Sequence, residues 1–518
     1  MTYLAVPIAG QNPDEASRQI KAAKAAGAEL LELRTDYLKG LNTDMVTSLI
    51  AEARSGRPAV PVIVTCRSKR QGGVRAYPDP VRVEILAGAL DAGAKFADFE
   101  YEHFLFLENQ EKIKRALSRN SKSRLILSAH NFENKFGNIE KLYSDILAAH
   151  PAAVAKLVYT ANHINDCFEA FDLLNHTDGE RIVFCMGPAG LISRIIAKKL
   201  NSYVTFASID EKTATASGQL TIGQLKELYR YDSIDRDTEL YGVIGSPVAH
   251  SLSPAIHNAC FTNIGARKLY LPLLVEGGKD EFDRFISNVL ARGWLGFKGF
   301  SVTIPHKQNA LEYVRRNEGF VEPLAEKIGA ANTLLVGAEG KLSGYNTDYA
   351  AALDAITSTL GVTRTELNNF PVAVIGAGGV ARAIVAGLTD AGAKVKIYNR
   401  TVEKGKKLAV DFNCDFAPLG DLSDLDAKLL INCTSIGMHP NVNEAPLPKE
   451  CIKKDMAVFD TVYNPAETVL LKHAREAGAK TIDGLSMFIN QAAAQFELFA
   501  GQDANRELMR KTATNCFS

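Results

Sequence analysis

Residues 371–392, with the sequence PVAVIGAGGVARAIVAGLTDAG, determine the fold of the second half of the chain. A short β-forming run is followed by a glycine turn and then by a helical pattern, which is the context that a dinucleotide-binding fingerprint requires. The glycines at 376, 378 and 379 allow the backbone to approach a pyrophosphate at the start of the helix. Ala381 replaces the third glycine, as the pattern permits. These residues predict a Rossmann domain, with a purely structural glycine turn as the alternative.

The strand predicted at residues 394–401 indicates which dinucleotide binds. It ends in Asn399, Arg400 and Thr401, where an NAD enzyme usually has Asp or Glu. A missing carboxylate and a present arginine favour the 2′-phosphate of NADP. The predicted cofactor is therefore NADP(H).

Lys307 and Asp348 are the candidate acid–base pair of this half. Lys307 ends the run GFSVTIPHK, and Asp348 ends GYNTD. Reduction of a ketone needs a proton at the oxygen as hydride reaches the carbon, and an ammonium held by a carboxylate supplies it. Each residue alone is more often a member of a surface ion pair. Only the fold can bring the two together, because a long stretch of chain separates them.

The first half of the chain contains eight short β-forming runs, most of them separated by amphipathic stretches. The runs occupy residues 4–10, 30–36, 60–67, 95–102, 124–131, 153–159, 182–187 and 203–208. Strands that alternate with helices in this number predict a closed parallel (β/α)8 barrel. The alternative, an open doubly wound sheet, would need fewer strands or a glycine-rich phosphate loop.

Polar residues gather where the strands of this barrel end, which is where barrel enzymes place their active sites. They are Glu32, Arg34, Arg67, Glu100, His130, Lys156, Arg194, Thr215 and Gln219. Glu32 and Arg34 are two residues apart and therefore face the same side of their strand. Their opposite charges are expected to neutralise each other.

Lys156 is the most informative of these residues because it lies in the apolar run AAVAKLVY. Burial disfavours the ammonium and favours the free amine, which attacks ketones to form an imine. His130, in the neighbouring predicted strand, is a candidate proton shuttle for such chemistry. The alternatives are a lysine whose stem lies along the barrel wall with its head in water, and a histidine that is merely hydrogen-bonded at a strand end.

The first half resembles the type I 3-dehydroquinate dehydratases over its whole length. The resemblance rests, in order, on LELRTD, VTCRSKRQGG, FADFEYE, SAHNFE, VAKLVYTANHINDC, MGPAGLISR and TASGQLTIGQL. It implies that Lys156 forms a Schiff base with the substrate ketone and that His130 moves protons in imine formation, water loss and imine breakdown. The residues that it implies for substrate binding are Glu32, Arg34, Arg67, Arg194, Thr215 and Gln219.

Two positions depart from the pattern of this family. Gln71 stands before two glycines where the family usually has Glu, so this side chain still forms hydrogen bonds but carries no negative charge. Thr215-Ala216-Ser217 stands where the loop commonly has Ser-Ala-Pro, and without the proline we expect a more mobile loop. A degenerate barrel, or a different Schiff-base enzyme such as a class I aldolase, is the alternative interpretation.

Residues 240–518 resemble the shikimate dehydrogenases. The motifs that carry this resemblance are SPVAHSLSP, GFSVTIPHK, GAANTL, GYNTD, VIGAGGVARA, YNRT, NCTSIGM, DTVYNP and DGLSMFINQAA. It implies that Lys307 and Asp348 are the catalytic pair. The residues implied to contact the substrate are Ser251, Ser253, Thr303, Asn332, Tyr463 and Gln491. Those implied to contact the cofactor are Gly376, Ala377, Gly378, Gly379, Val380, Ala381, Asn399, Arg400, Thr401, Thr434, Ser435, Met438, Gly484 and Met487.

The two resemblances meet in one compound, because 3-dehydroshikimate is the product of the first reaction and the substrate of the second. They imply a bifunctional lyase and oxidoreductase of the shikimate pathway of aromatic amino acid biosynthesis. It would dehydrate 3-dehydroquinate through a Lys156 Schiff base and reduce 3-dehydroshikimate to shikimate with NADPH. The expected domains are a barrel at 1–232, a shikimate-binding α/β domain at 238–348 plus 488–518, and a Rossmann NADP-binding domain at 349–487.

The composition is that of an ordinary globular protein, with 46% hydrophobic and 23% charged residues. Lys+Arg and Asp+Glu balance at 59 each, so small-molecule partners are expected rather than nucleic acid or membrane. The eight cysteines contain no Cys-x-x-Cys pair, and neither metal nor disulfides are expected. No targeting segment is recognisable, so we expect a cytoplasmic protein, with a removed transit peptide as the alternative.

Overall fold

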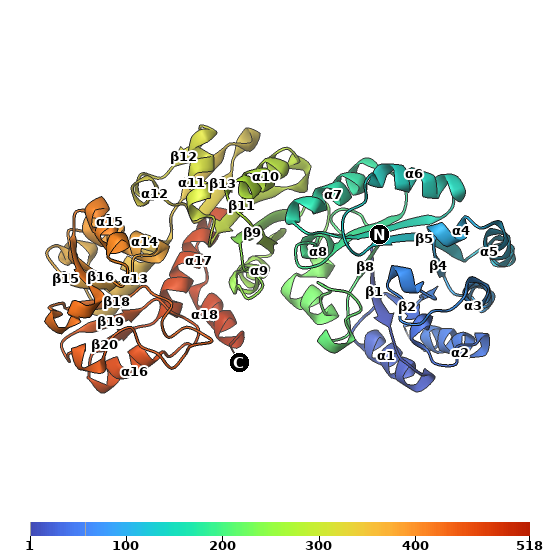
Figure 1. Ribbon diagram of the computed structural model, residues 1–518, viewed down its shortest axis with the longest axis horizontal. Helices are drawn as coiled ribbons and strands as arrows, with labels where there is room; N and C mark the ends of the chain where they lie inside the picture. The colour runs from blue at the N-terminus through green and yellow to red at the C-terminus, as the bar shows by residue number, and fades with distance from the viewer. Residues whose placement is uncertain (1, 57, 518) are drawn as a thin grey trace. The chain divides into compact units, whose positions relative to one another are not determined.

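The computed structural model describes residues 2–56 and 58–517, which form two compact units (Figure 1). Residues up to Glu239 lie in the first unit. Leu240–Tyr270 and the chain from Gly293 onward lie in the second. None of the helices in the described ranges is both long and apolar enough to cross a membrane.

The first unit is a near-closed, eight-stranded parallel barrel surrounded by helices (Figure 1). Its strands are β1 (Tyr3–Ile8), β2 (Leu30–Arg34), β3 (Val62–Thr65), β4 (Phe96–Glu100), β5 (Arg124–Asn131), β6 (Val154–Thr160), β7 (Arg181–Met186) and β8 (Val204–Phe206). The hydrogen-bonded order is β7-β6-β5-β4-β3-β2-β1-β8. The backbone N–H of Tyr203 donates to the carbonyl of Arg181 at 2.7 Å, which links the two end strands. Each strand coincides with one of the predicted runs, so the predicted barrel is confirmed.

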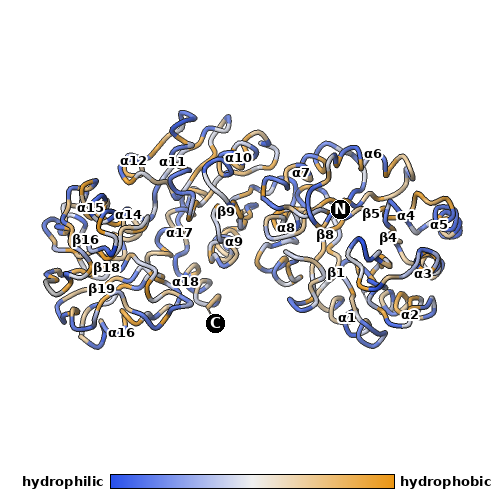
Figure 2. The backbone as a smooth tube through the Cα atoms, viewed as in Figure 1, coloured by the Kyte–Doolittle hydropathy of each residue, from blue (hydrophilic) through white to orange (hydrophobic). Residues whose placement is uncertain are grey.

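Helices fill the connections between these strands. They are α1 (Pro13–Ala25), α2 (Thr43–Arg54), α3 (Asp79–Asp91), α4 (Tyr101–Phe104), α5 (Leu107–Arg119), α6 (Ile139–Ala149), α7 (Cys167–His176) and α8 (Leu191–Ile195). The side chains of Asn12 and Asn42 cap α1 and α2 by accepting hydrogen bonds from backbone N–H groups of the first turn. Hydrophilic and hydrophobic residues alternate along the helices (Figure 2), as expected where one face packs against a barrel.

The interior of the barrel is filled by layers of side chains. Every strand contributes a buried apolar residue to this interior: Ala5, Leu30, Ile63, Phe96, Ile126, Val154, Ile182 and Val204. Side chains two residues apart along a strand face the same way, so Glu32, Asp98 and Lys156 also face the interior. Glu32 and Lys156 line the pocket described below.

The second unit contains two six-stranded sheets. The strands of the first are β9 (Glu239–Gly245), β10 (Lys268–Leu274), β11 (Phe297–Val302), β12 (Phe320–Val321), β13 (Thr333–Val336) and β14 (Leu342–Tyr345). They are ordered β10-β9-β11-β13-β14-β12, with β9 and β11 parallel and β11 and β13 antiparallel. The helices of this part are α9 (Ser253–Asn263), α10 (Lys279–Leu290), α11 (Lys307–Arg316) and α12 (Pro323–Ile328).

The other sheet is the predicted Rossmann sheet. Its strands are β15 (Pro371–Ile375), β16 (Lys394–Asn399), β17 (Asp415–Pro418), β18 (Leu429–Asn432), β19 (Ala457–Asp460) and β20 (Lys480–Ile482). All pairs are parallel, and the order β17-β16-β15-β18-β19-β20 is the 3-2-1-4-5-6 order of dinucleotide-binding domains. The surrounding helices are α13 (Asp348–Leu360), α14 (Gly379–Asp390), α15 (Val402–Phe412) and α16 (Val469–Glu476).

The last two helices connect the two sheets of this unit. Helix α17 (Gly484–Ala500) contacts α13 and also β11 and β13 of the first sheet, and α18 (Arg506–Asn515) packs against α9. The side chain of Gln495 on α17 accepts a hydrogen bond from Ser301 at 2.7 Å and donates to Thr333 at 3.0 Å. The end of the chain is thus held against the sheet that begins the unit.

Candidate active sites

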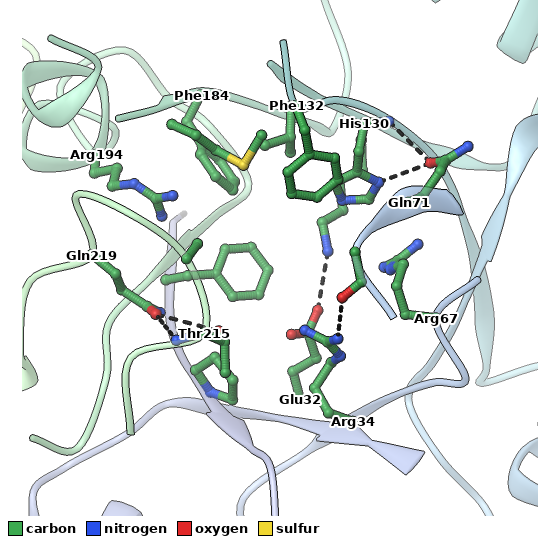
Figure 3. Close-up of a pocket in the computed structure, with 17 residues that line it drawn as sticks. Glu32, Arg34, Arg67, Gln71, His130, Phe132, Phe184, Arg194, Thr215 and Gln219 are labelled. Atoms are coloured by element: carbon green, nitrogen blue, oxygen red, sulfur yellow. Dashed lines mark hydrogen bonds and ion pairs between the residues drawn. The ribbon is translucent and has the colours of Figure 1, made fainter. Parts of the chain in front are cut away.

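A pocket opens into the interior of the barrel (Figure 3). Inward-facing residues of the strands line it, among them Pro7, Glu32, Lys156, Phe184 and Phe206. The pocket has an empty volume of about 540 Å³, its open mouth included. The residues that line it include all eight predicted for the first half: Glu32, Arg34, Arg67, His130, Lys156, Arg194, Thr215 and Gln219.

Lys156 lies at the base of this pocket between two carboxylates. Its Nζ is 3.0 Å from Glu32 Oε1 and 2.8 Å from Asp98 Oδ2, and all three side chains are buried. The ammonium also lies 4.6 Å from the centre of the Phe206 ring. The two acids balance the buried charge of the ammonium.

Glu32 and Arg34 pair with other residues rather than with each other. Glu32 contacts Lys156, whereas Arg34 forms two parallel hydrogen bonds of 2.9 Å to Asp36. Burial lowers the pKa of Arg34, but the hydrogen bond and the charge of Asp36 outweigh it and raise the pKa overall. The reason is geometric: Arg34 ends its strand, so its planar fork can turn toward the loop that carries Asp36.

Arg67 joins the strand ends beside Lys156. Its guanidinium donates to Asp98 at 2.7 Å, to Ser128 at 2.6 Å and to Glu100 at 3.2 Å. Burial raises the pKa of Asp98, but Arg67 and Lys156 together hold it well below its usual range. Glu100 belongs to this network, pairs with Arg82 as well, and does not line the pocket.

His130 forms the wall opposite Glu32. Its Nδ1 is 3.0 Å from Gln71 Oε1, and its ring stacks on Phe132 with centroids 6.2 Å apart. Burial lowers the pKa of His130 well below the usual value, and the positive charges of Arg67 and Lys156 lower it further. The imidazole is therefore neutral near pH 7 and able to accept a proton.

Arg194 is a buried cation that faces the pocket. Its Nε and Nη2 have no hydrogen-bond partner among the residues that the structure describes, and its guanidinium lies 4.5 Å from the centre of the Phe184 ring. Burial lowers the pKa of Arg194 to about 10. Figure 3 shows Arg194 and Gln219 on the side of the pocket away from Gln71. Because buried polar groups are otherwise almost always paired, this guanidinium is available to bind an anionic group.

Thr215 and Gln219 lie in the loop after β8, and each organises the other. The backbone N–H of Thr215 donates to Gln219 Oε1 at 2.8 Å, and the Thr215 hydroxyl lies 3.3 Å from the same oxygen. Both residues line the pocket.

The second unit brings Lys307 and Asp348 into direct contact. Lys307 begins α11, Asp348 begins α13, and Nζ and Oδ2 are 2.5 Å apart. Asn332 donates to the other oxygen of Asp348 at 2.9 Å, which fixes the orientation of the carboxylate. A partly buried ammonium held in this way can donate a proton and then be protonated again.

The other residues predicted to bind the substrate lie on different elements of this unit. Ser253 begins α9 and is buried, Ser251 accepts a hydrogen bond from its N–H at 3.3 Å, and Thr303 directly follows β11. Tyr463 stacks on Phe488 with centroids 4.9 Å apart. The backbone carbonyl of Gln491 accepts from Thr347, the neighbour of Asp348, at 3.3 Å. Among the described residues, none of these side chains hydrogen-bonds directly to Lys307 or Asp348.

The glycine turn after β15 fits the pyrophosphate of a dinucleotide. Gly376 has φ +114°, and a Cβ there would lie 3.1 Å from the Cys433 carbonyl, so a side chain would be strained and crowded. A Cβ on Gly378 or Gly379 would point into open space, and Gly378 caps α14 without any side-chain hydrogen bond. Free backbone N–H groups at the start of a helix are the arrangement that binds phosphate.

Several of the other residues predicted to bind the cofactor follow strands next to β15. Asn399 ends β16 and donates to Thr401 O at 2.7 Å, and Arg400 between them is exposed. Thr434 is held by Asn432 after β18, at 2.7 Å, and Ser435 beside it is exposed. In the same loop the backbone N–H of Met438 donates to Ser435 O at 3.2 Å, and Met438 is 45% exposed. Met487 on α17 is buried, and a Cβ on Gly484 would lie 2.4 Å from the Val462 carbonyl. Ala377 and Val380 flank the glycine turn, and Ala381 is buried in α14.

Asp98 and Glu102 are the polar residues near the barrel pocket that sequence reasoning missed. Asp98 lies two residues before Glu100 in the run FADFEYE, so the alternation that placed Glu32 and Arg34 on one face would also have identified Asp98. No pattern in the sequence distinguishes Glu102, which becomes relevant only because the fold brings it to Gln71.

Four family models match the chain in succession. The model described as type I 3-dehydroquinase matches residues 4–236. The models for the shikimate dehydrogenase substrate binding domain, shikimate/quinate 5-dehydrogenase and the shikimate 5′-dehydrogenase C-terminal domain match residues 243–334, 360–469 and 484–514. Both halves of the chain are therefore covered by families of known activity.

Individual proteins match in the same way. The chloroplastic bifunctional 3-dehydroquinate dehydratase/shikimate dehydrogenase of Arabidopsis thaliana is 36% identical over 98% of this chain and 83% of its own length. The NADP(+) shikimate dehydrogenase of Methanosarcina barkeri is 40% identical over 53% of this chain and 97% of its own length. A crystal structure of a shikimate dehydrogenase in complex with NADP+ aligns with a TM-score of 0.50 at 36% identity, over 55% of this chain and 98% of that one.

Proposed function

Because this chain belongs to the family of bifunctional 3-dehydroquinate dehydratase/shikimate dehydrogenases, we propose that the two sites described above catalyse its two reactions. The first unit is a type I 3-dehydroquinate dehydratase, a lyase, and the second is an NADP-dependent shikimate dehydrogenase, an oxidoreductase. The contact of Lys156 with two buried acids beneath a pocket that holds an unpaired arginine is the observation that best supports the proposed barrel site.

In the barrel, the amine of Lys156 attacks the ketone of 3-dehydroquinate and loses water to form an iminium. The iminium withdraws electrons from the neighbouring carbon, which makes a proton on that carbon removable. His130, neutral for the reasons given above, takes this proton and passes it to the hydroxyl one carbon further, which leaves as water. Hydrolysis of the imine then releases 3-dehydroshikimate and restores Lys156. Arg194 holds the substrate carboxylate, with Glu32, Arg34, Arg67, Thr215 and Gln219 around the ring hydroxyls.

In the second unit, Lys307 donates a proton to the ketone oxygen of 3-dehydroshikimate, and Asp348 keeps the lysine charged and oriented. NADPH supplies the hydride when bound at the glycine turn. Arg400, which is exposed after β16, would bind its 2′-phosphate, and Ser251, Ser253, Thr303, Asn332, Tyr463 and Gln491 would hold the substrate.

Oxidation of NADPH after addition of 3-dehydroquinate tests the two assignments together. We expect consumption with 3-dehydroquinate and, in a parallel sample, with 3-dehydroshikimate, because the first compound is converted to the second on the same chain. Consumption with 3-dehydroshikimate alone would contradict the dehydratase assignment. No consumption with either would contradict the dehydrogenase assignment.

Replacement of Arg194 should affect substrate binding and protein stability in opposite directions. For Arg194→Met we expect the KM for 3-dehydroquinate to rise roughly 100-fold, because hydrogen bonds to a charged group contribute about 1.5–3 kcal/mol each. The free energy of unfolding without substrate should rise by about 1 kcal/mol, since a buried guanidinium with unpaired N–H groups is removed. Steady-state kinetics and urea unfolding measure the two effects. A lower stability together with an unchanged KM would show that Arg194 is merely structural.

A further inference from the structure

The hydrogen bonds of Gln71 identify which nitrogen of His130 carries the proton. Gln71 Oε1 lies 3.0 Å from the backbone N–H of His130 and 3.0 Å from its ring Nδ1. A backbone N–H can only donate, so the atom of Gln71 that faces it must be the amide oxygen. An amide oxygen can only accept, so Nδ1 must be the protonated nitrogen of the neutral ring. Nε2 is then unprotonated and available as the base.

Glu102 secures the same orientation from the other end of the amide. Gln71 Nε2 donates to Glu102 Oε1 at 2.9 Å, and that oxygen also lies 3.5 Å from His103 Nε2. A flip of the amide would place its oxygen against the carboxylate and its N–H₂ against the N–H of His130, which are two repulsive contacts. The carboxylate is 55% exposed and does not reach His130 itself, so it acts only through Gln71.

The loop that carries Gln71 is held by the rest of the barrel. Gln71 is buried, and its N–H donates to Ser68 O at 2.9 Å. Arg34 donates to the carbonyl of Gly72, which has φ +87° and allows the chain to turn there. A Cβ on Gly73 would lie 2.0 Å from the carbonyl of Arg67, so the loop is tightly packed. The amide is therefore presented from a fixed position.

The charged groups that face His130 come from four elements. They are Arg67 from the loop after β3, Lys156 from β6, Asp98 from β4 and Arg34 from β2. Three of the four are positive, and the neutral amide of Gln71 adds no negative charge to offset them. The surroundings thus favour the neutral ring, whose function depends on which nitrogen holds its proton.

We propose that Gln71 fixes His130 in the tautomer with a free Nε2, and that Glu102 is a positioning residue that holds the amide of Gln71 in the required orientation. This inference rests on the role proposed for His130 in the dehydratase reaction. The tautomer of His130 can be measured without substrate, so the inference about Gln71 is tested independently of the catalytic role proposed for His130.

The tautomer is measured by NMR of the full chain with ¹⁵N-labelled histidine, and the His130→Asn variant identifies the signals of this ring. We expect Nδ1 to show the shift of a protonated nitrogen and Nε2 that of an unprotonated one. In Gln71→Leu, which keeps the size but lacks the acceptor, the two forms should mix. A proton on Nε2 in the unmodified chain would overturn the proposal, as would an unchanged tautomer in Gln71→Leu.

The role of Glu102 is tested by two substitutions. Glu102→Ala should lower the dehydratase kcat about three- to tenfold, the value of one ordinary hydrogen bond. Glu102→Gln should retain activity near that of the unmodified chain, because its amide oxygen still accepts from Gln71. Glu111→Ala on α5 removes an exposed carboxylate that does not touch Gln71 and is the matched control. Equal losses in the Ala and Gln variants of Glu102, or no loss in either, would contradict the positioning role.

Gln71→Glu tests the charge at this position through pH. A carboxylate against Nδ1 favours the imidazolium, so the pKa of His130 rises. His130 is active when unprotonated, and activity is lost as the pH falls through this pKa. The acidic limb of the dehydratase kcat profile should therefore move about one unit or more to higher pH. An acidic limb that stays in place would show that residue 71 does not govern His130.

Discussion

Lys156→Arg is expected to lower the dehydratase kcat by roughly 10⁴-fold or more, the scale of losing a covalent nucleophile. The guanidinium keeps the positive charge between Glu32 and Asp98, yet it cannot form an imine. Borohydride added with 3-dehydroquinate should fix a substrate-derived mass on the peptide that contains Lys156 in the unmodified chain and leave the variant unlabelled. Dehydrogenase activity, which resides in the second unit, should not change.

Lys156→Met provides the matching stability experiment. It leaves Glu32 and Asp98 as uncompensated buried carboxylates, which should lower the free energy of unfolding by about 3–5 kcal/mol. Lys156→Arg should be less destabilised because the cation remains. Borohydride labelling of the barrel in either variant would contradict the assignment of Lys156 as the imine-forming residue.

Lys307→Met is expected to lower the dehydrogenase kcat by about 10²–10⁴-fold, the usual contribution of a general acid. The KM for 3-dehydroshikimate should change much less, because the proton is needed only as the ketone is reduced. Lys298→Met, at an exposed position of β11, is the matched control and should leave both constants unchanged. Dehydratase activity, followed by formation of the enone product, should be the same in all three proteins.

Asp348→Asn completes this set of variants. The amide can still accept a hydrogen bond from Lys307 but no longer balances its charge. We expect a smaller loss than in Lys307→Met, with a changed pH dependence of kcat. An activity of Lys307→Met close to that of the unmodified chain would exclude Lys307 as the proton donor.

The sequence predicts the barrel and the Rossmann sheet well because both depend on local patterns. The eight β-forming runs and the strand–turn–helix at 371–392 are short-range signals, and each run coincides with an observed strand. The polar residues at the strand ends can be predicted from the sequence for the same reason. The carboxyl ends of successive parallel strands lie at one rim of the barrel. The sequence therefore predicts that Glu32, His130 and Lys156 lie together at that rim.

Partner choice within the sites could not be predicted, because it depends on distances between residues far apart in the chain. The alternation along β2 placed Glu32 and Arg34 on one face, but it could not show that Arg34 turns to Asp36 while Glu32 meets Lys156. The contact of Gln71 with Glu102 likewise exists only in the folded chain. The pairing of acidic with basic side chains therefore depends on the tertiary structure.

The layered interior of the barrel has a consequence for how the first unit acquires activity. Lys156 and Glu32 are separated by 124 positions in the chain, and Lys156 and Asp98 by 58. Contacts of such large sequence separation form only after the chain entropy of long loops has been lost, so they require the folded barrel. Until the first and middle strands enclose one interior, the amine has no acids beside it and remains an ordinary solvated lysine. Closure of the barrel and the appearance of a reactive amine are therefore one event, and an incompletely folded chain does not expose a competent nucleophile to other carbonyl compounds in the cell.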